Sequence, residues 1–326
     1  MLSVFSLTPQ GLKQVERAPA SPLPEEALWL DLLEPTVEEE RLVEARLDVS
    51  VPTREEMREI ETSNRMYEED GAVYLTATVL TKLETDQPEN SQVTFILKGP
   101  RLVTNRYVDP LPFRRYIAYA ERHPQTCNSA PAILAGLLES FVNRIADIIE
   151  RVGSDMDVAS AEVFNTSRLK RKRRVQRDFR RVLERVGQSG ELIAKTRESL
   201  VSLSRLLTYV QQSNLLQING EVRNRMRTLS RDVVAMSDHA NFLGTNLNFL
   251  LDATLGMINI DQNNILKIFS VVTVFLLPPS VIAGIYGMNF RHIPGLDDTW
   301  GFYGALGLMV LSAVLPYLLF KRRGWL

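Results

Sequence analysis

Two long runs of uncharged, mostly apolar positions lie near the C-terminal end of the sequence. They span residues 268–290 and 299–320. Because a helix needs about 20 apolar residues to cross the hydrocarbon core of a bilayer, this pattern predicts two transmembrane helices joined by a short loop. A buried helical hairpin of a soluble protein is the alternative interpretation, but paired uncharged runs of this length are rare in soluble cores.

Apolar positions upstream of these runs recur at steps of three and four residues, which is the spacing of an amphipathic helix. The pattern predicts one long helix that begins at Ala130 and a second over Phe179–Val210. No proline interrupts residues 132–277, so very long helices are compatible with this region. A third helix, over residues 221–286, would run into the first apolar run and measure on the order of 100 Å.

The N-terminal part of the chain, residues 1–108, has a mixed pattern. Short apolar or alternating segments bounded by turn residues predict strands, at Val4–Leu7, Ala27–Leu33, Ala72–Lys82, Gln92–Leu97 and Arg101–Tyr107. The last two flank Lys98-Gly99-Pro100, which is typical of a hairpin turn. Segments opened by a capping residue or a proline predict helices, at Thr36–Leu47 and Pro52–Ile60.

These elements together predict a fold class and its domain boundaries. The fold class is an α/β cytosolic domain followed by long α-helices and two C-terminal transmembrane helices. The expected boundaries are a cytosolic α/β domain (1–129), a cytosolic long-helix region (130–218), a stalk helix continuing into the first transmembrane helix (219–290), a periplasmic loop (291–299), and the second transmembrane helix with a basic cytoplasmic tail (300–326).

Charge is distributed unevenly, although the net charge is only −1. Residues 1–100 carry 20 acidic and 9 basic side chains, whereas residues 101–326 carry 19 acidic and 29 basic ones. Since positive charge marks the cytoplasmic side of a membrane protein, the basic flanks of the apolar runs place both termini in the cytoplasm. These flanking residues are either a simple anchor or a basic ring at the inner mouth of a pore: Lys267, Lys321, Arg322 and Arg323.

Composition excludes several classes of protein. A hydrophobic content of 45% is too high for a disordered chain. The single cysteine, Cys127, excludes an intramolecular disulfide and a cysteine-based zinc or iron–sulfur site within one chain. The three histidines are far apart, and no Gly-x-x-x-x-Gly-Lys phosphate loop is present. Nothing in the sequence therefore suggests coupling to ATP. We expect a protein that is not an enzyme.

A polar stripe follows one side of the first predicted transmembrane helix and of its cytosolic approach. At about 100° per residue, its members fall within one arc: Asp252, Asn259, Asn263, Leu266, Ser270, Thr273, Leu277, Ser280 and Gly284. The only hydroxyl-bearing residues between positions 268 and 285 belong to this stripe. Chance clustering is one alternative, and hydroxyls that bond back to their own helix are another.

Two helices cannot enclose a pore, so a pore lined by this stripe requires several copies of the chain. Rings of Asp252, Asn259 and Asn263 would then line the cytoplasmic approach, and hydroxyl rings would alternate with rings of Leu266 and Leu277. Carboxylate rings attract cations, and narrow apolar rings gate by dewetting. Oxygen ligands suit a hard cation such as Mg²⁺ better than thiolate-seeking metals.

The first apolar run ends in Tyr286-Gly287-Met288-Asn289. At the outer end of the first of two C-terminal spans, this tetrapeptide resembles the signature of the CorA family of divalent-cation channels. The resemblance covers essentially the whole chain, and the overall pattern is similar to the CorA type of enteric bacteria. A helix C-cap is the plain alternative for Gly-Met-Asn, because glycine and asparagine favour helix C-termini.

The resemblance implies a funnel-shaped homopentamer in the inner membrane of a bacterium, with a pore lined by the first membrane helix. It implies passive influx of Mg²⁺, and also of Co²⁺ and Ni²⁺. Gly287, Met288 and Asn289 would form the selectivity filter. A ring of Asn289 side chains would hydrogen-bond the water shell of Mg²⁺ without stripping it, since Mg²⁺ dehydrates reluctantly.

The resemblance also implies that Mg²⁺ is a regulatory ligand. Members of the family close when Mg²⁺ binds between the cytosolic domains of neighbouring subunits. Asp232 resembles the family's carboxylate on the stalk helix, and three acids of the α/β domain are candidate partners: Glu68, Glu69 and Asp70.

Two other functions stay open: a zinc transporter of the same superfamily, and a membrane-anchored scaffold or sensor that conducts nothing. Zinc-transporting relatives usually replace the methionine of the motif, whereas Met288 is intact here. The basic run Arg168–Arg181 fits a solvated or lipid-facing helix better than a nucleic-acid patch, since Phe179 is its only aromatic residue. We expect the lipid bilayer, divalent cations and further copies of the chain as partners, and no nucleic acid.

Overall fold

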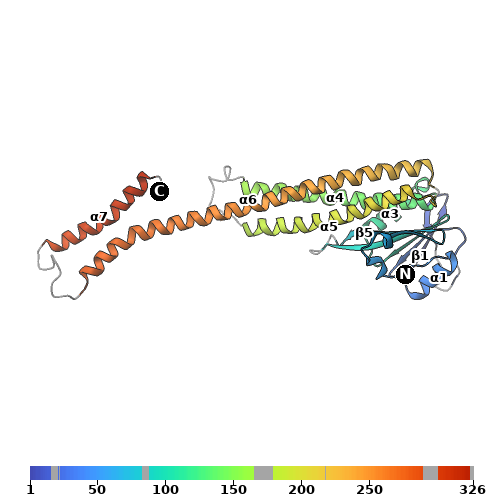
Figure 1. The fold of residues 1–326 in the computed structure, drawn as a ribbon, viewed down its shortest axis with the longest axis horizontal. Coiled ribbons are helices and arrows are strands. Elements are labelled where there is room, and N and C mark those ends of the chain that lie inside the picture. Colours follow the sequence, from blue (N-terminus) through green and yellow to red (C-terminus); the bar gives the residue numbers. More distant parts are fainter. Residues whose placement is uncertain are drawn as a thin grey trace. The chain divides into compact units, whose positions relative to one another are not determined.

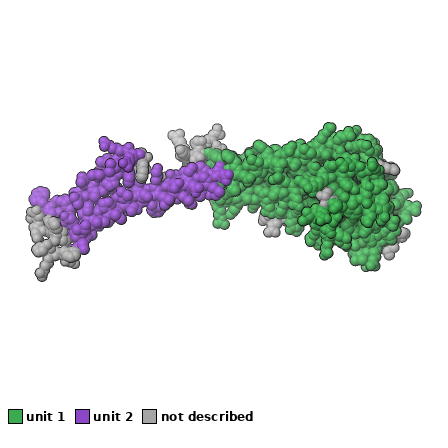
Figure 2. All heavy atoms as spheres, viewed as in Figure 1, with its two compact units in different colours: residues 1–251 green, residues 252–326 purple. Residues whose placement is uncertain are grey.

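The computed structural model describes residues 1–15, 21, 23–82, 88–164, 179–216, 218–288 and 300–323. The chain divides into two compact units, residues 1–251 and 252–326, which Figure 2 colours separately. Unit 1 contains a β-sheet and the helices that pack on it. Unit 2 contains only helical segments among its described residues.

A seven-stranded sheet lies at one end of unit 1, and the long helices extend beyond it (Figure 1). Its strand order is β2-β1-β3-β7-β6-β5-β4. Among the described strands, β3 and β7 run parallel and every other neighbouring pair runs antiparallel. The strands are β1 (Leu2–Thr8), β2 (Gly11–Gln14), β3 (Ala27–Leu33), β4 (Met66–Glu69), β5 (Ala72–Thr81), β6 (Glu89–Lys98) and β7 (Arg101–Arg106).

The helices of unit 1 lie between the strands of the sheet or follow them in the sequence, and the longest helix continues into unit 2. They are α1 (Val37–Leu47), α2 (Thr62–Arg65), α3 (Leu111–Ala120), α4 (Ala130–Phe164), α5 (Phe179–Gln212), α6 (Gly220–Tyr286) and, in unit 2, α7 (Gly301–Arg322). Two short 3₁₀ turns accompany them, η1 (Glu56–Arg58) and η2 (Pro124–Thr126).

Helices cover both faces of the sheet (Figure 1). On one face, Val43 of α1 joins Leu30 of β3 in a buried cluster. On the other face, Trp29 stacks on Phe5 with ring centroids 4.5 Å apart and lies 6.2 Å from the ring of Phe113 in α3. Leu30 and Trp29 face opposite sides because successive side chains of a strand alternate.

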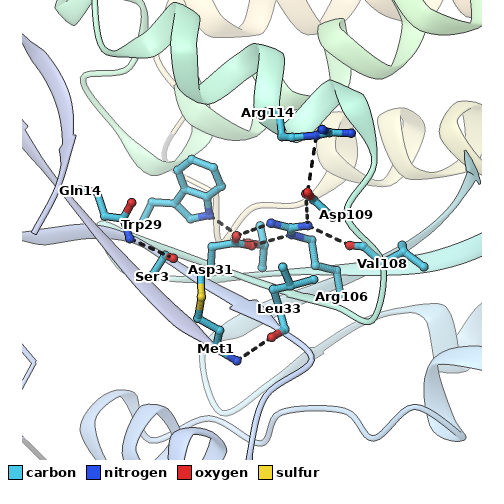
Figure 3. A network of polar contacts seen from close by, with 11 residues as sticks. Met1, Ser3, Gln14, Trp29, Asp31, Leu33, Arg106, Val108, Asp109 and Arg114 are labelled. Carbon is cyan, nitrogen blue, oxygen red and sulfur yellow. Dashed lines mark hydrogen bonds and ion pairs between the residues drawn. The ribbon is translucent and has the colours of Figure 1, made fainter. Parts of the chain in front are cut away.

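A buried ion pair ties β3 to β7 (Figure 3). Arg106 donates to both carboxylate oxygens of Asp31, at 3.0 and 2.7 Å, and both side chains are almost fully buried. Thr104 also donates to Asp31, and the indole of Trp29 donates to Thr104. Burial alone would lower the pKa of Arg106, but hydrogen bonds and attraction from Asp31 outweigh it, so this pKa lies above its ordinary value. The guanidinium also lies over the ring of Phe113, 4.4 Å from its centroid.

Helix α5 covers the part of β5 that β4 leaves unpaired. The register of β4 reaches only residues 72–75 of β5. Beyond that point Ser199 Oγ donates to the carbonyl of Thr78 at 2.9 Å, and the N–H of Thr78 donates to Ser202 Oγ at 2.8 Å. Two serines of one helix therefore satisfy both backbone groups of an otherwise open strand position.

The first half of α6 packs along α4 inside unit 1. Arg225 of α6 donates two hydrogen bonds to the carboxylate of Glu139 in α4, at 2.7 and 3.1 Å. Farther along both helices, Phe249 of α6 stacks with Phe164 of α4, with ring centroids 6.3 Å apart. The two contacts follow the same order along both helices, so α4 and α6 run parallel.

All five strands predicted from the sequence are present, with ends shifted by three residues at most. The helix predicted over Thr36–Leu47 is confirmed and begins with a capping box, in which Thr36 and Glu39 each bond the other's backbone N–H. The three long helices are also confirmed as α4, α5 and α6.

The helix predicted over Pro52–Ile60 is wrong, because only the 3₁₀ turn η1 forms there. The backbone N–H and the hydroxyl of Thr53 both donate to the carboxylate of Glu56, at 2.8 and 2.9 Å. Upstream, the carbonyl of Pro52 accepts from the side-chain amide of Asn105 at 2.8 Å. These local and tertiary side-chain bonds replace the helical ladder.

Candidate functional site

Two helices are long and apolar enough to cross a membrane. The most apolar 18-residue window has a mean hydropathy of 2.2 in α6 and 1.9 in α7. No residue of either window is buried in the single chain. Apolar helices left uncovered over such a length are typical of surfaces that face lipid or other chains.

The polar stripe predicted from the sequence lies entirely on α6, and all nine of its members are exposed in the single chain. The half-buried residues of the same segment include Val271, Pro278, Ile282 and Tyr286. At about 100° per residue they fall on the opposite side of the helix from the stripe. The stripe is therefore on a face that its own chain does not cover. Its role as the lining of a pore stays a prediction.

Two hydroxyls of the stripe bond within their own helix. Thr273 Oγ1 donates to the carbonyl of Phe269, and Ser280 Oγ donates to the carbonyl of Leu276, each at 2.8 Å. A hydroxyl that donates its proton keeps its acceptor lone pairs. Each oxygen can therefore still accept a hydrogen bond from the water shell of a cation.

Two consecutive prolines, Pro278 and Pro279, lie inside α6. Neither has an N–H group, so the carbonyls of Val274 and Phe275 lose their usual helical donors. The helix nevertheless continues to Tyr286. The two prolines thus leave two backbone carbonyl oxygens without a helical N–H donor in the most apolar part of the chain.

The chain leaves α6 through Gly287 and Met288. The N–H of Gly287 donates to the carbonyl of Ala283 at 2.9 Å, and the N–H of Met288 donates to that of Ile285 at 3.3 Å. Gly287 does not have a positive φ, so this residue itself is not a left-handed helix cap. Asn289 lies outside the described residues, and its ring stays a prediction.

The four basic positions expected at a cytoplasmic mouth are exposed. Lys267 lies on α6, Lys321 and Arg322 form the last turn of α7, and Arg323 is its C-cap. Cations in the last turn interact favourably with the helix dipole. The basic run Arg168–Arg181 lies outside the described residues except for its last three positions, which open α5.

The candidate regulatory acids of the α/β domain lie around one hairpin. Glu68 and Glu69 belong to β4, and Asp70 follows in the turn to β5. Asp70 and Gly71 both have positive φ, 48° and 74°, which is the geometry of a tight two-residue hairpin turn. Asp70 therefore has a structural role in this turn, whether or not it binds a metal.

Asp232, the expected partner on α6, is exposed. Within the described part of one chain, no group of three or more acidic, histidine or cysteine side chains is placed to hold a metal ion. The expected regulatory site joins two copies of the chain, so it stays a prediction.

Comparison with known proteins gives concordant results over the full length. A family model described as "CorA-like Mg2+ transporter protein" matches residues 24–322. Two curated relatives, each called magnesium transport protein CorA, are 33% identical (Escherichia coli K12) and 32% identical (Salmonella typhimurium). Both matches extend over 326 residues and cover 100% of each chain.

Solved structures share the fold. The complete structure of the CorA magnesium transporter from Methanocaldococcus jannaschii matches with a TM-score of 0.78 at 19% identity, covering 100% of this chain and 99% of that one. The ZntB cytoplasmic domain from Vibrio parahaemolyticus matches with a TM-score of 0.58 at 11% identity, covering 80% of this chain and 98% of that one. At these identities the likeness shows the fold alone.

Proposed function

The chain belongs to the family of CorA-like Mg²⁺ transporter proteins, and from this premise we propose that it conducts Mg²⁺ across a membrane as a channel. Several copies, a homopentamer by the family resemblance, assemble around a shared axis. The stripe of α6 lines the path of the ion, and α7 lies in the bilayer.

The observation that carries this proposal is the uncovered face of α6. Its polar members, Asp252, Asn259, Asn263, Ser270, Thr273 and Ser280, all present oxygen acceptors, and the stripe contains no histidine or cysteine. Mg²⁺ binds oxygen ligands and retains several of its waters. Carboxylate, amide and hydroxyl oxygens hydrogen-bond such a water shell, so hydrated Mg²⁺ passes without being fully dehydrated.

At the outer end of α6, Gly287, Met288 and Asn289 form the selectivity filter of the proposed channel. Rings of Leu266 and Leu277 form its apolar constrictions, because narrow apolar rings resist water when closed. Hydrated Co²⁺ and Ni²⁺ resemble hydrated Mg²⁺ in charge and in their water shells, so we extend the proposal to these two ions.

The driving force is the membrane potential. Each elementary charge gains about 2.3 kcal/mol per 100 mV, and a divalent ion gains twice that amount on moving inward. Lys267 and the basic end of α7, residues 321–323, face the cytoplasm of a bacterium by the positive-inside rule. The loop over residues 291–299 then faces outward, which places the filter at the entry side of the inner membrane.

Intracellular Mg²⁺ closes the proposed channel. Asp232 of one copy and the acids around the β4–β5 turn of its neighbour supply the carboxylates of the regulatory site. Two carboxylates brought together repel each other unless a cation lies between them. Loss of Mg²⁺ therefore loosens the contact between the copies and opens the path.

Zinc transport is the second candidate function, because the cytoplasmic domain of a protein called ZntB shares this fold. Ion flux into liposomes that hold the full-length protein and a metal-sensitive dye separates the candidates. Mg²⁺ entry that depends on the voltage supports the proposal. Entry of Zn²⁺ but not Mg²⁺ favours the second candidate, and no entry of either ion favours a scaffold or sensor.

A further inference from the structure

Three aromatic side chains form a cluster at the start of α7. Trp300 is the N-cap of the helix, and Phe302 and Tyr303 lie in its first turn. The ring centroid of Tyr303 is 5.9 Å from that of Trp300 and 5.6 Å from that of Phe302. The N–H of Gly304 donates to the carbonyl of Trp300 at 2.9 Å, so the helix backbone holds these residues together. We call the three residues the aromatic cluster.

The aromatic cluster is exposed in the single chain. Trp300, Phe302 and Tyr303 are 75%, 71% and 64% exposed. At about 100° per residue, Trp300 and Tyr303 lie on the side of α7 opposite to half-buried positions such as Ala305 and Ser312. The described part of the chain therefore leaves the cluster uncovered.

Two members of the cluster combine a large apolar ring with one polar atom. Within the described residues, the indole N–H of Trp300 and the hydroxyl of Tyr303 form no hydrogen bond. Burial against another protein surface would require a partner for each of these atoms. At the boundary of a bilayer, by contrast, the rings contact acyl chains while the polar atoms meet headgroups and water. The chemistry of the cluster thus favours the boundary layer of a membrane.

The length of α7 places the cluster at such a boundary. The distance along the helix from Trp300 to Lys321 is about 31 Å, and no charged residue lies between them. The hydrocarbon core of a bilayer is about 30 Å thick. When the basic end of α7 lies at one boundary of the core, the aromatic cluster therefore lies at the other.

Helix α6 repeats this arrangement in the opposite direction. Its apolar run begins after Lys267 and the helix ends at Tyr286. These two residues are about 28 Å apart along the helix, again with no charged residue between them. Each of the two apolar helices thus has a lysine at one end and an aromatic residue at the other, about one hydrocarbon thickness apart.

We propose that the aromatic cluster anchors α7 at the boundary between the acyl chains and the phospholipid headgroups, in the leaflet opposite the basic end of α7. The indole of Trp300 and the phenol of Tyr303 donate hydrogen bonds to phosphate and ester oxygens, and Phe302 adds apolar area. The inference rests on the proposed function in one respect, that α7 crosses a bilayer. It adds that a lipid contact, and not a contact with another copy, fixes the depth of α7.

Quenching of tryptophan fluorescence by brominated phospholipids tests this contact in liposomes that hold the full-length protein. Bromine quenches an indole only at close approach, so lipids brominated near the headgroup or near the end of the acyl chain report its depth. All proteins carry Trp325→Phe. Trp29 is fully buried in unit 1, so it adds a constant, unquenched signal. The signal of Trp300 is the difference from a Trp300→Phe variant.

We expect bromines near the headgroup to quench Trp300 at least about twofold more than bromines near the chain end, because an indole at the boundary lies about 15 Å from the centre of the core. Stronger quenching of Trp300 by the deep bromines would overturn the proposal. Little quenching by either lipid would overturn it as well, because the cluster would then face water or another protein surface.

The matched control carries Leu311→Trp together with Trp300→Phe. Leu311 is 60% exposed and lies on the same side of α7 as Trp300, about three helical turns or 16 Å farther along. This distance is about half the thickness of the hydrocarbon core. The deep bromines should therefore quench the control indole more strongly than the shallow ones, which calibrates the two lipids in the same helix.

A change of acyl-chain length separates an anchor from a mere match in length. In a slightly thicker bilayer, an anchored helix keeps its aromatic end at the boundary and adapts by reducing its tilt or by thinning the adjacent lipid. We expect the preference of Trp300 for shallow bromines to persist. A shift of Trp300 towards quenching by the deep bromines would overturn the anchor.

Mg²⁺ flux is measured on the same proteins in liposomes without brominated lipid. Voltage-dependent flux together with a deep or unquenched Trp300 refutes only the anchor. Shallow quenching of Trp300 without flux refutes the proposed transport and leaves the anchor standing.

Discussion

Gly136 of α4 faces the ring of Tyr116 of α3 across a gap that admits no side chain. A Cβ placed on Gly136 would lie 2.2 Å from Cε2 and 2.9 Å from Cζ of that ring. The ring cannot easily retreat, because its centroid is already 6.0 Å from that of Trp29 in the sheet. The glycine therefore sets how closely α3 and α4 approach each other.

Gly136→Ala should destabilise the protein by about 1–3 kcal/mol, the usual cost of overpacking a filled core. Gly153→Ala is the matched control on the same helix, because nothing lies within 4 Å of a Cβ at Gly153. The control should be neutral or stabilising by up to about 1 kcal/mol. Thermal unfolding of the two purified variants, followed by circular dichroism, makes the comparison. Equal midpoints would contradict the close approach.

Arg106→Leu should cost about 3–5 kcal/mol, because it leaves the carboxylate of Asp31 buried without a counter-charge. Asp31→Leu should cost less than this, since the guanidinium of Arg106 keeps its ion pair with Asp109 at 2.9 Å. Combining the two changes should cost clearly less than the sum of the single changes, because neither charge is then left unpaired. Denaturant unfolding of the three variants measures this coupling. Strictly additive losses would show that the pair does not act as a unit.

Asn289→Ala should abolish Mg²⁺ uptake while leaving assembly intact. The physical reason is the loss of a ring of amide oxygens that hydrogen-bond the water shell of the ion. Uptake is measured with a metal-sensitive dye in liposomes, and assembly by size-exclusion chromatography. Normal uptake by the variant would remove the filter assignment.

Leu266→Asn and Leu277→Asn should each raise Mg²⁺ leak at high internal Mg²⁺, when the channel is closed. An amide wets a ring that an apolar side chain keeps dry. Val271→Asn is the control, because Val271 is half-buried and lies on the other side of α6, whereas Leu266 and Leu277 are 62% and 57% exposed. An equal leak through the control variant would show that the pore face is misassigned.

Asp232→Ala should weaken inhibition by Mg²⁺ without blocking conduction. The change removes one carboxylate from a site shared between copies, so more cation is needed to hold the copies together. The internal Mg²⁺ concentration that halves the flux should rise about tenfold, which corresponds to a loss of about 1.4 kcal/mol of binding free energy. An unchanged value would place the sensor at other residues.

The parts of this fold that the sequence predicts are those with a long repeating signal. The helical periodicity before and across the first apolar run predicts α4, α5 and α6, and a dense apolar segment predicts β3. Edge strand β4 was missed because Met66 is its only buried residue, so it shows no alternation. Helix α3 was also missed, since at ten residues it provides too few repeats of the helical period.

The ion pair of Asp31 and Arg106 could not be predicted from the sequence, for a different reason. The two residues are 75 positions apart, and only the parallel pairing of β3 with β7 brings them together. For the candidate pore, the stripe could be predicted because its positions share one helix face. The pocket lined by Glu56, Glu59, Glu68 and Glu69 could not be predicted, because these residues come from η1, from its C-cap and from β4, which only the tertiary fold brings together.

The serine pair on α5 has a consequence for how this chain behaves among its own copies. A strand position with an unsatisfied N–H and carbonyl is a template on which a foreign strand can grow. Ser199 and Ser202 occupy both groups of Thr78, so β5 presents no such template there. In the proposed assembly of several identical copies, this position of β5 therefore gives the sheet of a neighbouring copy no backbone groups with which to pair.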